Sequence, residues 1–121
     1  MKITFSLGAL TAVQLAELCE GKLIGDCIQS NITVEGICTD SREAGADVAF
    51  CALRGERVDG HSFIGSVLEG GCGVILCERI PDGIHSENAS FILVSNAEAS
   101  LSVLAMNYKR MLSCKIGRAH V

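Results

Sequence analysis

The sequence has no tryptophan, one tyrosine and four phenylalanines in 121 residues. So few aromatic rings leave little material for the platforms on which unpaired bases stack. Positive charge is also in the minority, because 10 Lys and Arg face 14 Asp and Glu, which gives a formal net charge of −4. A protein that neutralises many phosphates needs the opposite balance. We therefore expect no nucleic-acid partner.

Metal-ligand spacing is missing as well, although the chain has seven Cys and three His. No pair of Cys is separated by two residues, and none of the His stands at ligand spacing from a Cys. We expect no metal site and reduced thiols that pack as small apolar side chains, as in a cytoplasmic protein. A thiol-redox or metal protein is the alternative that the high Cys count leaves open.

Long apolar runs are absent too, since none approaches the roughly 20 residues that span a bilayer. Lys2 and the apolar stretch 3–10 resemble the start of a signal peptide, but the stretch continues into a helical pattern containing Gln14, Glu17 and Glu20. We expect no membrane span and a cytoplasmic location.

The remaining composition is that of one globular domain, with 49% hydrophobic and 20% charged residues. Helical patterns alternate with short apolar stretches, which predicts an α/β fold: a three-layer arrangement of short strands with helices on the sheet faces. The expected helices are 11–20, 61–69 and one that begins near Ser95. The expected strands are 22–24, 32–34, 37–39, 48–53, 74–77 and 91–94, with turns at 25–26, 30–31 and 35–36.

Local signals mark the ends of these helices. Thr11 and Gln14 have capping-box spacing, as do Ser95 and Glu98, and Gly21 is expected to end the first helix. The last helix has the clearest periodicity, with apolar side chains at Leu101, Leu104, Ala105, Tyr108, Met111 and Leu112.

Two loops that follow strands carry the polar residues of most interest. The first is Thr39-Asp40-Ser41-Arg42, where a guanidinium, a hydroxyl and turn amides suit an anion. The alternative is that Asp40 and Ser41 only stabilise the turn and that Arg42 is a solvated charge.

The second loop is 54–62, where Gly55 and Gly60 permit close backbone approach and Asp59 or Ser62 is placed to cap the following helix. The alternative here is a charged surface loop. His61 has no obvious nucleophile partner, and we expect it to be a hydrogen-bonded structural residue.

Sequence motifs for phosphate cradles and hydrolase nucleophiles are absent, because no GxxxxGK[ST], GxGxxG or GxSxG occurs. The glycine-rich stretch 70–73 precedes a strand, which predicts a tight turn. We expect no catalytic residue in this chain.

The stretches 39–42, 49–55 and 56–64, which read TDSR, AFCALRG and ERVDGHSFI, together resemble the N-terminal domain of the Mur ligases over about residues 10–115. The string 55–64 is most similar to the members that add D-alanyl-D-alanine, and members that add the third peptide residue are the alternative. Ala46, Val48, Cys51 and Gly71-Cys72 depart from the family pattern, and we expect them to affect packing more than the site.

The resemblance implies a domain that binds the UDP end of a UDP-N-acetylmuramoyl-peptide within an ATP-dependent ligase. It aligns Thr39, Ser41 and Arg42 with one uridine-nucleotide loop and Glu56, Arg57 and Val58 with another. ATP and Mg²⁺ belong to a further domain of such enzymes, so no cofactor is expected in residues 1–115.

The final hexapeptide 116–121, Ile-Gly-Arg-Ala-His-Val, stands where the family would continue toward a Thr-Gly-x-x-Gly-Lys-Thr loop. It looks like translated sequencing adapter, with a genuine short C-terminus as the alternative. We therefore expect a ligase fragment that is inactive alone, or else a free-standing nucleotide-sugar-binding module.

Overall fold

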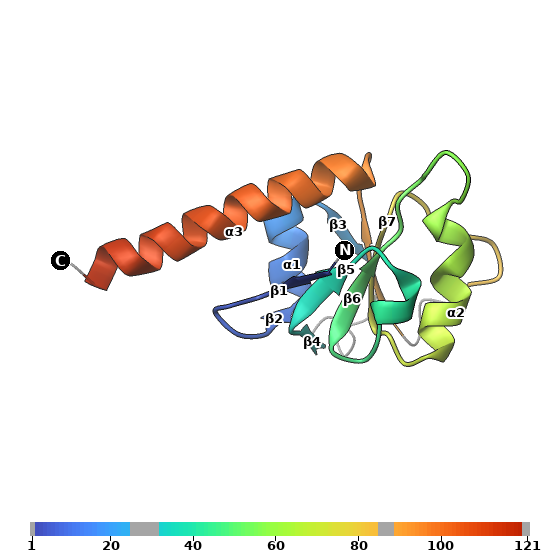
Figure 1. Ribbon diagram of the computed structural model, residues 1–121, viewed down its shortest axis with the longest axis horizontal. Helices are drawn as coiled ribbons and strands as arrows, with labels where there is room; N and C mark the ends of the chain where they lie inside the picture. The colour runs from blue at the N-terminus through green and yellow to red at the C-terminus, as the bar shows by residue number, and fades with distance from the viewer. Residues whose placement is uncertain (1, 25–31, 85–88, 120–121) are drawn as a thin grey trace.

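The computed structural model describes residues 2–24, 32–84 and 89–119, with side chains described as far as residue 113. Within these segments one sheet of six strands runs in the order β1-β5-β6-β7-β8-β3 (Figure 1). The strands span Lys2–Thr4 (β1), Gly36–Cys38 (β5), Val48–Cys51 (β6), Val74–Cys77 (β7), Ser90–Leu93 (β8) and Lys22–Ile24 (β3).

The four central strands are parallel, and both edge strands are antiparallel to their neighbours. Most residues of the central strands are fully buried, because both faces of the sheet are covered. A separate two-stranded ladder joins β2 (Leu10–Thr11) to β4 (Thr33–Val34).

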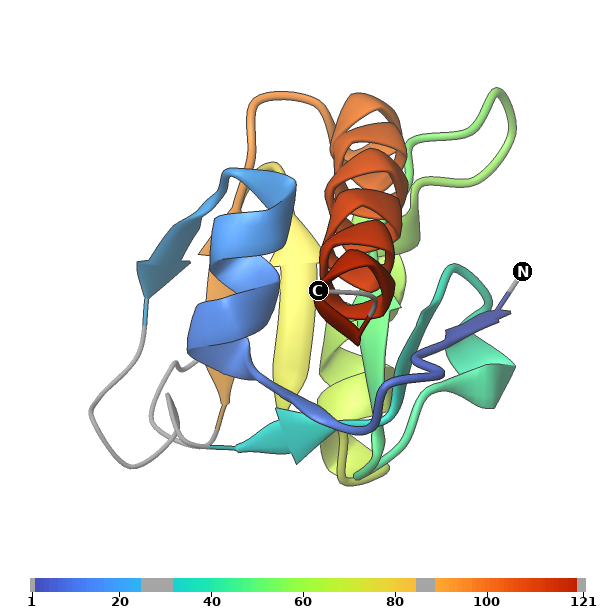
Figure 2. The same ribbon diagram turned by 90° about the vertical axis from the view of Figure 1, so that its left-hand side faces the viewer.

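Helices cover both faces of this sheet, which confirms the predicted three-layer α/β fold. Helices α1 (Ala12–Cys19) and α3 (Ala97–Ala119) pack on one face, and the short helix α2 (Ile64–Glu69) packs on the other (Figure 2). Alternate residues of the central strands supply the two apolar layers: Ile37, Ala49 and Leu76 face α1 and α3, whereas Phe50 and Ile75 face α2.

The first helix begins as predicted. The Thr11 hydroxyl accepts a hydrogen bond from the Gln14 amide (3.1 Å), and the Gln14 side chain accepts one from the Thr11 amide (2.9 Å). Its end differs from the prediction, because Glu20, with φ 58°, takes the left-handed conformation instead of Gly21. Gly21 is needed for packing: a Cβ there would lie 2.5 Å from Ile92 Cγ2.

The other element boundaries shift by small amounts. Asn96, not Ser95, caps α3, since its side-chain oxygen accepts a hydrogen bond from the Ala99 amide at 2.9 Å. The predicted helix 61–69 begins as a 3₁₀ turn, Gly60–Phe63, and strand 48–53 ends at Cys51. The turns expected at 25–26 and 30–31 lie outside the described residues.

Two further features were not expected. Strands β1 and β2 were missed because the stretch 2–10 resembles the start of a signal peptide and residue 11 was assigned to the first helix. Helix α3 runs on to Ala119, so its backbone crosses the junction predicted at residues 115/116 without a break. None of the helices in the described segments is long and apolar enough to cross a membrane.

The thiols of Cys19, Cys38, Cys51, Cys72 and Cys77 are free and buried. Burial raises the pKa of the Cys51 and Cys77 thiols to about 12 and those of Cys19 and Cys38 to about 11. Among the described residues, no group of three His, Cys, Asp or Glu side chains is placed to hold a metal ion.

We therefore predict that these five thiols resist alkylation in the folded protein at pH 8, because the reactive thiolate is scarce and covered. All seven Cys react once the chain is unfolded under non-reducing conditions. Mass spectrometry of iodoacetamide-treated samples checks both statements. Rapid labelling of Cys51 in the native protein, or three disulfides after denaturation, would contradict them.

Candidate functional site

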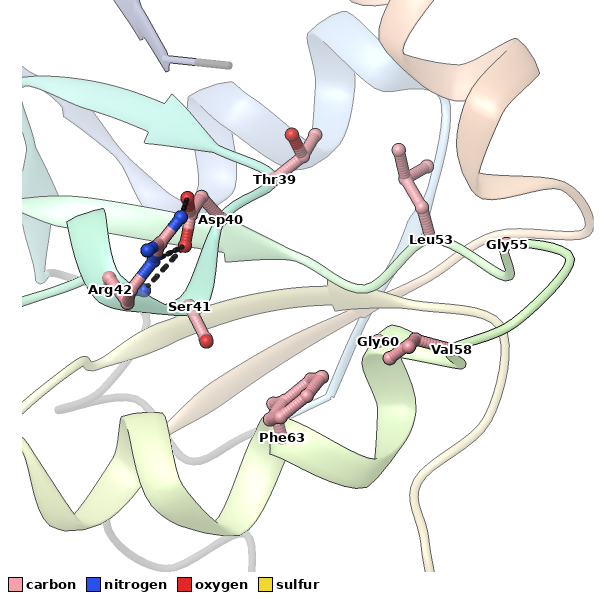
Figure 3. A pocket seen from close by; sticks show the side chains of 9 residues that line it. All are labelled: Thr39, Asp40, Ser41, Arg42, Leu53, Gly55, Val58, Gly60 and Phe63. Carbon is pink, nitrogen blue, oxygen red and sulfur yellow. Dashed lines mark hydrogen bonds and ion pairs between the residues drawn. The ribbon is translucent and has the colours of Figure 1, made fainter.

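A pocket of about 690 Å³ opens at the carboxyl ends of β5 and β6 (Figure 3). Its walls come from the two loops singled out in the sequence and from the start of the second helical segment. The lining residues are Thr39, Asp40, Ser41, Arg42, Leu53, Gly55, Val58, Gly60 and Phe63. Loops beyond the carboxyl ends of parallel strands are where α/β sheets bind ligands.

The first loop forms a 3₁₀ turn, Ser41–Glu43, capped by Asp40, whose Oδ1 accepts a hydrogen bond from the Arg42 amide at 2.9 Å. The Arg42 guanidinium binds the same carboxylate twice, from Nε to Oδ1 at 3.1 Å and from Nη2 to Oδ2 at 2.8 Å. Asp40 thus stabilises the turn, and its carboxylate fixes the position of the Arg42 guanidinium.

These bonds define the electrostatics of the first loop. The hydrogen bonds from the Arg42 side chain lower the pKa of Asp40 to about 2. Because the pKa of Asp40 is lower in the folded than in the unfolded chain, its ionised carboxylate stabilises the fold at pH values above the ordinary carboxyl pKa. This stabilisation is lost as the pH falls toward 2. The Arg42 side chain is 87% exposed, so the guanidinium edge turned away from Asp40 is accessible to an anion.

The second loop is a narrow hairpin whose stem is backbone. The Gly60 amide donates to Leu53 O at 2.7 Å, and the Gly55 amide donates to Val58 O at 2.9 Å. A Cβ at Gly60 would lie 2.8 Å from Leu53 N. The absence of a side chain at Gly60 therefore allows the two backbone segments of the hairpin stem to lie close together. Val58 lines the pocket; Glu56 and Arg57 belong to the same loop but are not among the lining residues.

Apolar side chains form a wall that sequence reasoning did not identify. Leu53 and Phe63 both line the pocket, and Phe63 is 38% exposed. The spacing of Phe63, Ile64 and Val67 within the predicted helix 61–69 fits one apolar helix face, so the sequence does not distinguish Phe63 from the core residues. The 3₁₀ start of this segment instead leaves the ring beside the pocket (Figure 3).

His61 is a structural residue, as predicted. It is buried, with 2% of its surface exposed, and its Nδ1 lies 2.7 Å from Asp59 Oδ1. Its Nε2 accepts a hydrogen bond from the Glu78 amide at 3.0 Å, so both ring nitrogens have partners within the fold. Asp59 also caps the 3₁₀ turn by accepting the His61 amide, which is the largest cause of an Asp59 pKa lowered to about 2.

The pocket is therefore suited to binding. Hydroxyl groups and a guanidinium lie on one side, and Leu53, Val58 and Phe63 offer apolar contact on the other. Among the described residues that line the pocket there is no His, Cys or Lys to act as a general base. Such a combination of groups would suit an anionic ligand that also carries a flat, partly apolar group.

Comparisons with known proteins show the family of the chain. Residues 33–115 match the family model described as Mur ligase family, catalytic domain. The UDP-N-acetylmuramoyl-tripeptide--D-alanyl-D-alanine ligase of Bacillus subtilis is 32% identical over 107 residues, 88% of this chain and 23% of that protein. The UDP-N-acetylmuramoyl-L-alanyl-D-glutamate--2,6-diaminopimelate ligase of Cytophaga hutchinsonii is 32% identical over 88 residues, 73% of this chain and 18% of that protein.

A solved structure is similar as well. A crystal structure of MurF from Acinetobacter baumannii superposes with a TM-score of 0.73 at 33% identity, covering 88% of this chain and 22% of that one. The chain thus spans about a fifth of the length of the relatives it matches.

We predict that Gly60→Ala deforms the pocket, because the added methyl group meets backbone atoms that cannot rotate away. Overpacking of this kind costs about 1–3 kcal/mol of unfolding free energy. Gly45→Ala is the matched control, since a Cβ there meets nothing within 4 Å. Urea unfolding of both variants checks the prediction, and equal stabilities would contradict it.

Proposed function

Because the chain belongs to the Mur ligase family, we propose that it is the part of such a ligase that holds the uridine nucleotide of a UDP-N-acetylmuramoyl-peptide. The observation that carries the proposal is the pocket itself. It joins Thr39, Ser41 and Arg42 of one loop to Val58 of the other, so that one cavity contains four of the six residues aligned with nucleotide binding.

Each type of side chain in the pocket has a role in this proposal. The hydroxyls of Thr39 and Ser41 offer hydrogen bonds to the uridine, whose base packs against Leu53, Val58 and Phe63. Arg42 offers its free guanidinium edge to the pyrophosphate. Glu56 and Arg57 approach the nucleotide from the tip of the hairpin.

For the complete ligase we propose D-alanyl-D-alanine addition to UDP-N-acetylmuramoyl-tripeptide in peptidoglycan synthesis, in the cytoplasm. The string 55–64 supports this choice, as does a match that is longer than the one to the diaminopimelate ligase, 107 against 88 residues. Addition of the third peptide residue is the alternative, because relatives of both kinds are 32% identical.

The chemistry of bond formation lies outside this chain in our proposal. ATP and Mg²⁺, held by another part of the ligase, supply activation of the substrate carboxylate for attack by the dipeptide amine. Residues 39–63 contribute by fixing the far end of the substrate, which reduces the entropy lost when the reacting groups meet.

A free-standing nucleotide-sugar-binding module is the second candidate. It is favoured by the fact that all pocket residues come from one short stretch, 39–63, of this chain. The genomic sequence after codon 115 separates the two: an in-frame Gly-Lys-Thr loop supports the ligase, and a stop codon supports the module.

We predict that UDP-N-acetylmuramoyl-tripeptide binds this chain and that ATP binds more weakly or not at all. Calorimetric titration with each ligand measures the difference. Arg42→Ala should weaken binding several-fold, because a donor to the pyrophosphate is lost, while exposed Arg110→Ala on α3 should leave it unchanged. A stronger response to ATP than to the uridine nucleotide would contradict the proposal.

We also predict that the chain alone releases no ADP when mixed with ATP, Mg²⁺, tripeptide substrate and D-alanyl-D-alanine. Phosphoryl transfer requires a phosphate-cradling loop with a suitably placed Lys and a Mg²⁺ site, and no such loop occurs in these 121 residues. A coupled ADP assay against a mock preparation is the measurement. Turnover above the mock level would show that the chain is not an inactive fragment.

A further inference from the structure

Glu78, the first residue after β7, makes one ion pair and two hydrogen bonds, which reach three separate parts of the chain. Its Oε1 forms an ion pair with Arg54 Nε at 3.0 Å, and its Oε2 accepts a hydrogen bond from the Ala97 amide, the first of α3, at 2.9 Å. Its own amide donates to His61 Nε2 at 3.0 Å. The Glu78 side chain is only 15% exposed, so these bonds are partly shielded from water.

Two of these partners lie at opposite ends of the pocket hairpin. Arg54 opens the hairpin and pairs with Asp59 across it, and His61 follows its last residue, Gly60. One residue outside the pocket lining therefore holds both stems of the loop that contributes Gly55, Val58 and Gly60 to the wall.

We propose that Glu78 is a positioning residue for the pocket: it fixes hairpin 54–60 by holding Arg54 with its carboxylate and His61 with its amide. The Ala97 amide occupies the second carboxylate oxygen, which keeps Glu78 oriented toward Arg54. The effect on nucleotide affinity rests on the proposed function, whereas the effect on the hairpin does not.

A simple helix-capping role is the competing explanation. The Glu78 carboxylate lies at the N-terminus of α3, where negative charge is favourable whatever happens at the hairpin. If capping were its only role, loss of the carboxylate would lower stability and leave the hairpin as it is. Glu98, in the first turn of α3, has the same charge near the same helix end and provides the matched comparison.

The test uses the full chain with Glu78→Gln, Arg54→Gln, both together, and Glu98→Gln as the control. Amide hydrogen exchange of Gly55 and Gly60 reports on the hairpin without any ligand, since both amides are bonded within the stem. Calorimetric titration with UDP-N-acetylmuramoyl-tripeptide reports on the pocket.

We expect Glu78→Gln to speed exchange at Gly55 and Gly60 and to weaken binding, each by about three- to tenfold, as for loss of a partly buried ion pair. The double variant should be no worse than Glu78→Gln, because both changes break the same bond. Glu98→Gln should leave exchange and affinity unchanged.

Unchanged exchange at both glycines in Glu78→Gln, equal effects in Glu98→Gln, or additive effects in the double variant would overturn the positioning role. If the unaltered chain binds no uridine nucleotide, the proposed function fails. The exchange measurements then still decide whether Glu78 positions the hairpin.

Discussion

The parallel pairing of β5, β6, β7 and β8 is the constraint on which the other features depend. Because these strands run in one direction and pair in register, the residues that follow them emerge at one edge of the sheet. Thr39 follows β5, Leu53 and Arg54 follow β6, Glu78 follows β7 and Asn96 follows β8. Burial of both sheet faces stabilises this alignment. The pocket residues and the residues that position them lie in the segments that follow these four strands.

The same local device builds both loops of the pocket. Asp40 and Asp59 have nearly identical backbone angles, φ −98°, ψ 120° and φ −99°, ψ 118°, and each caps a 3₁₀ turn by accepting the amide two residues ahead. Each carboxylate also binds the side chain of that residue, Arg42 in one loop and His61 in the other. In the first loop the bound side chain, Arg42, is exposed to solvent, and in the second loop the imidazole ring of His61 is buried.

Sequence patterns were sufficient for the layers and for the polar half of the pocket. Runs such as 74–77 are apolar enough to predict a strand covered on both faces, and the loops after strands drew attention to Ser41 and Arg42. Strands β1 and β2 were missed although β3, β4 and β5 are equally short, because the apolar stretch 2–10 resembles the start of a signal peptide and leads into the first helix. Apolar pocket residues such as Phe63 were missed because their spacing looks the same as that of core residues.

Supporting contacts were harder to predict than lining residues. Glu78 lies 24 residues beyond Arg54 and 19 before Ala97, and nothing in the sequence around it indicates its ion pair with Arg54 or its two hydrogen bonds. Only the tertiary arrangement of strand ends brings these groups together. The end of α1 was misassigned for a similar reason, since the packing of Gly21 against β8 is a long-range contact.

The lone tyrosine has a practical consequence for spectroscopy. Tyr108 on α3 stacks on Phe5 with ring centroids 5.4 Å apart, and its hydroxyl oxygen accepts a hydrogen bond from the Leu7 amide at 2.8 Å. With no tryptophan in the chain, intrinsic emission excited near 280 nm comes from this one ring. Tyrosine fluorescence therefore reports on the contact between the N-terminal segment and α3. It does not report directly on the pocket, because Tyr108 does not line it.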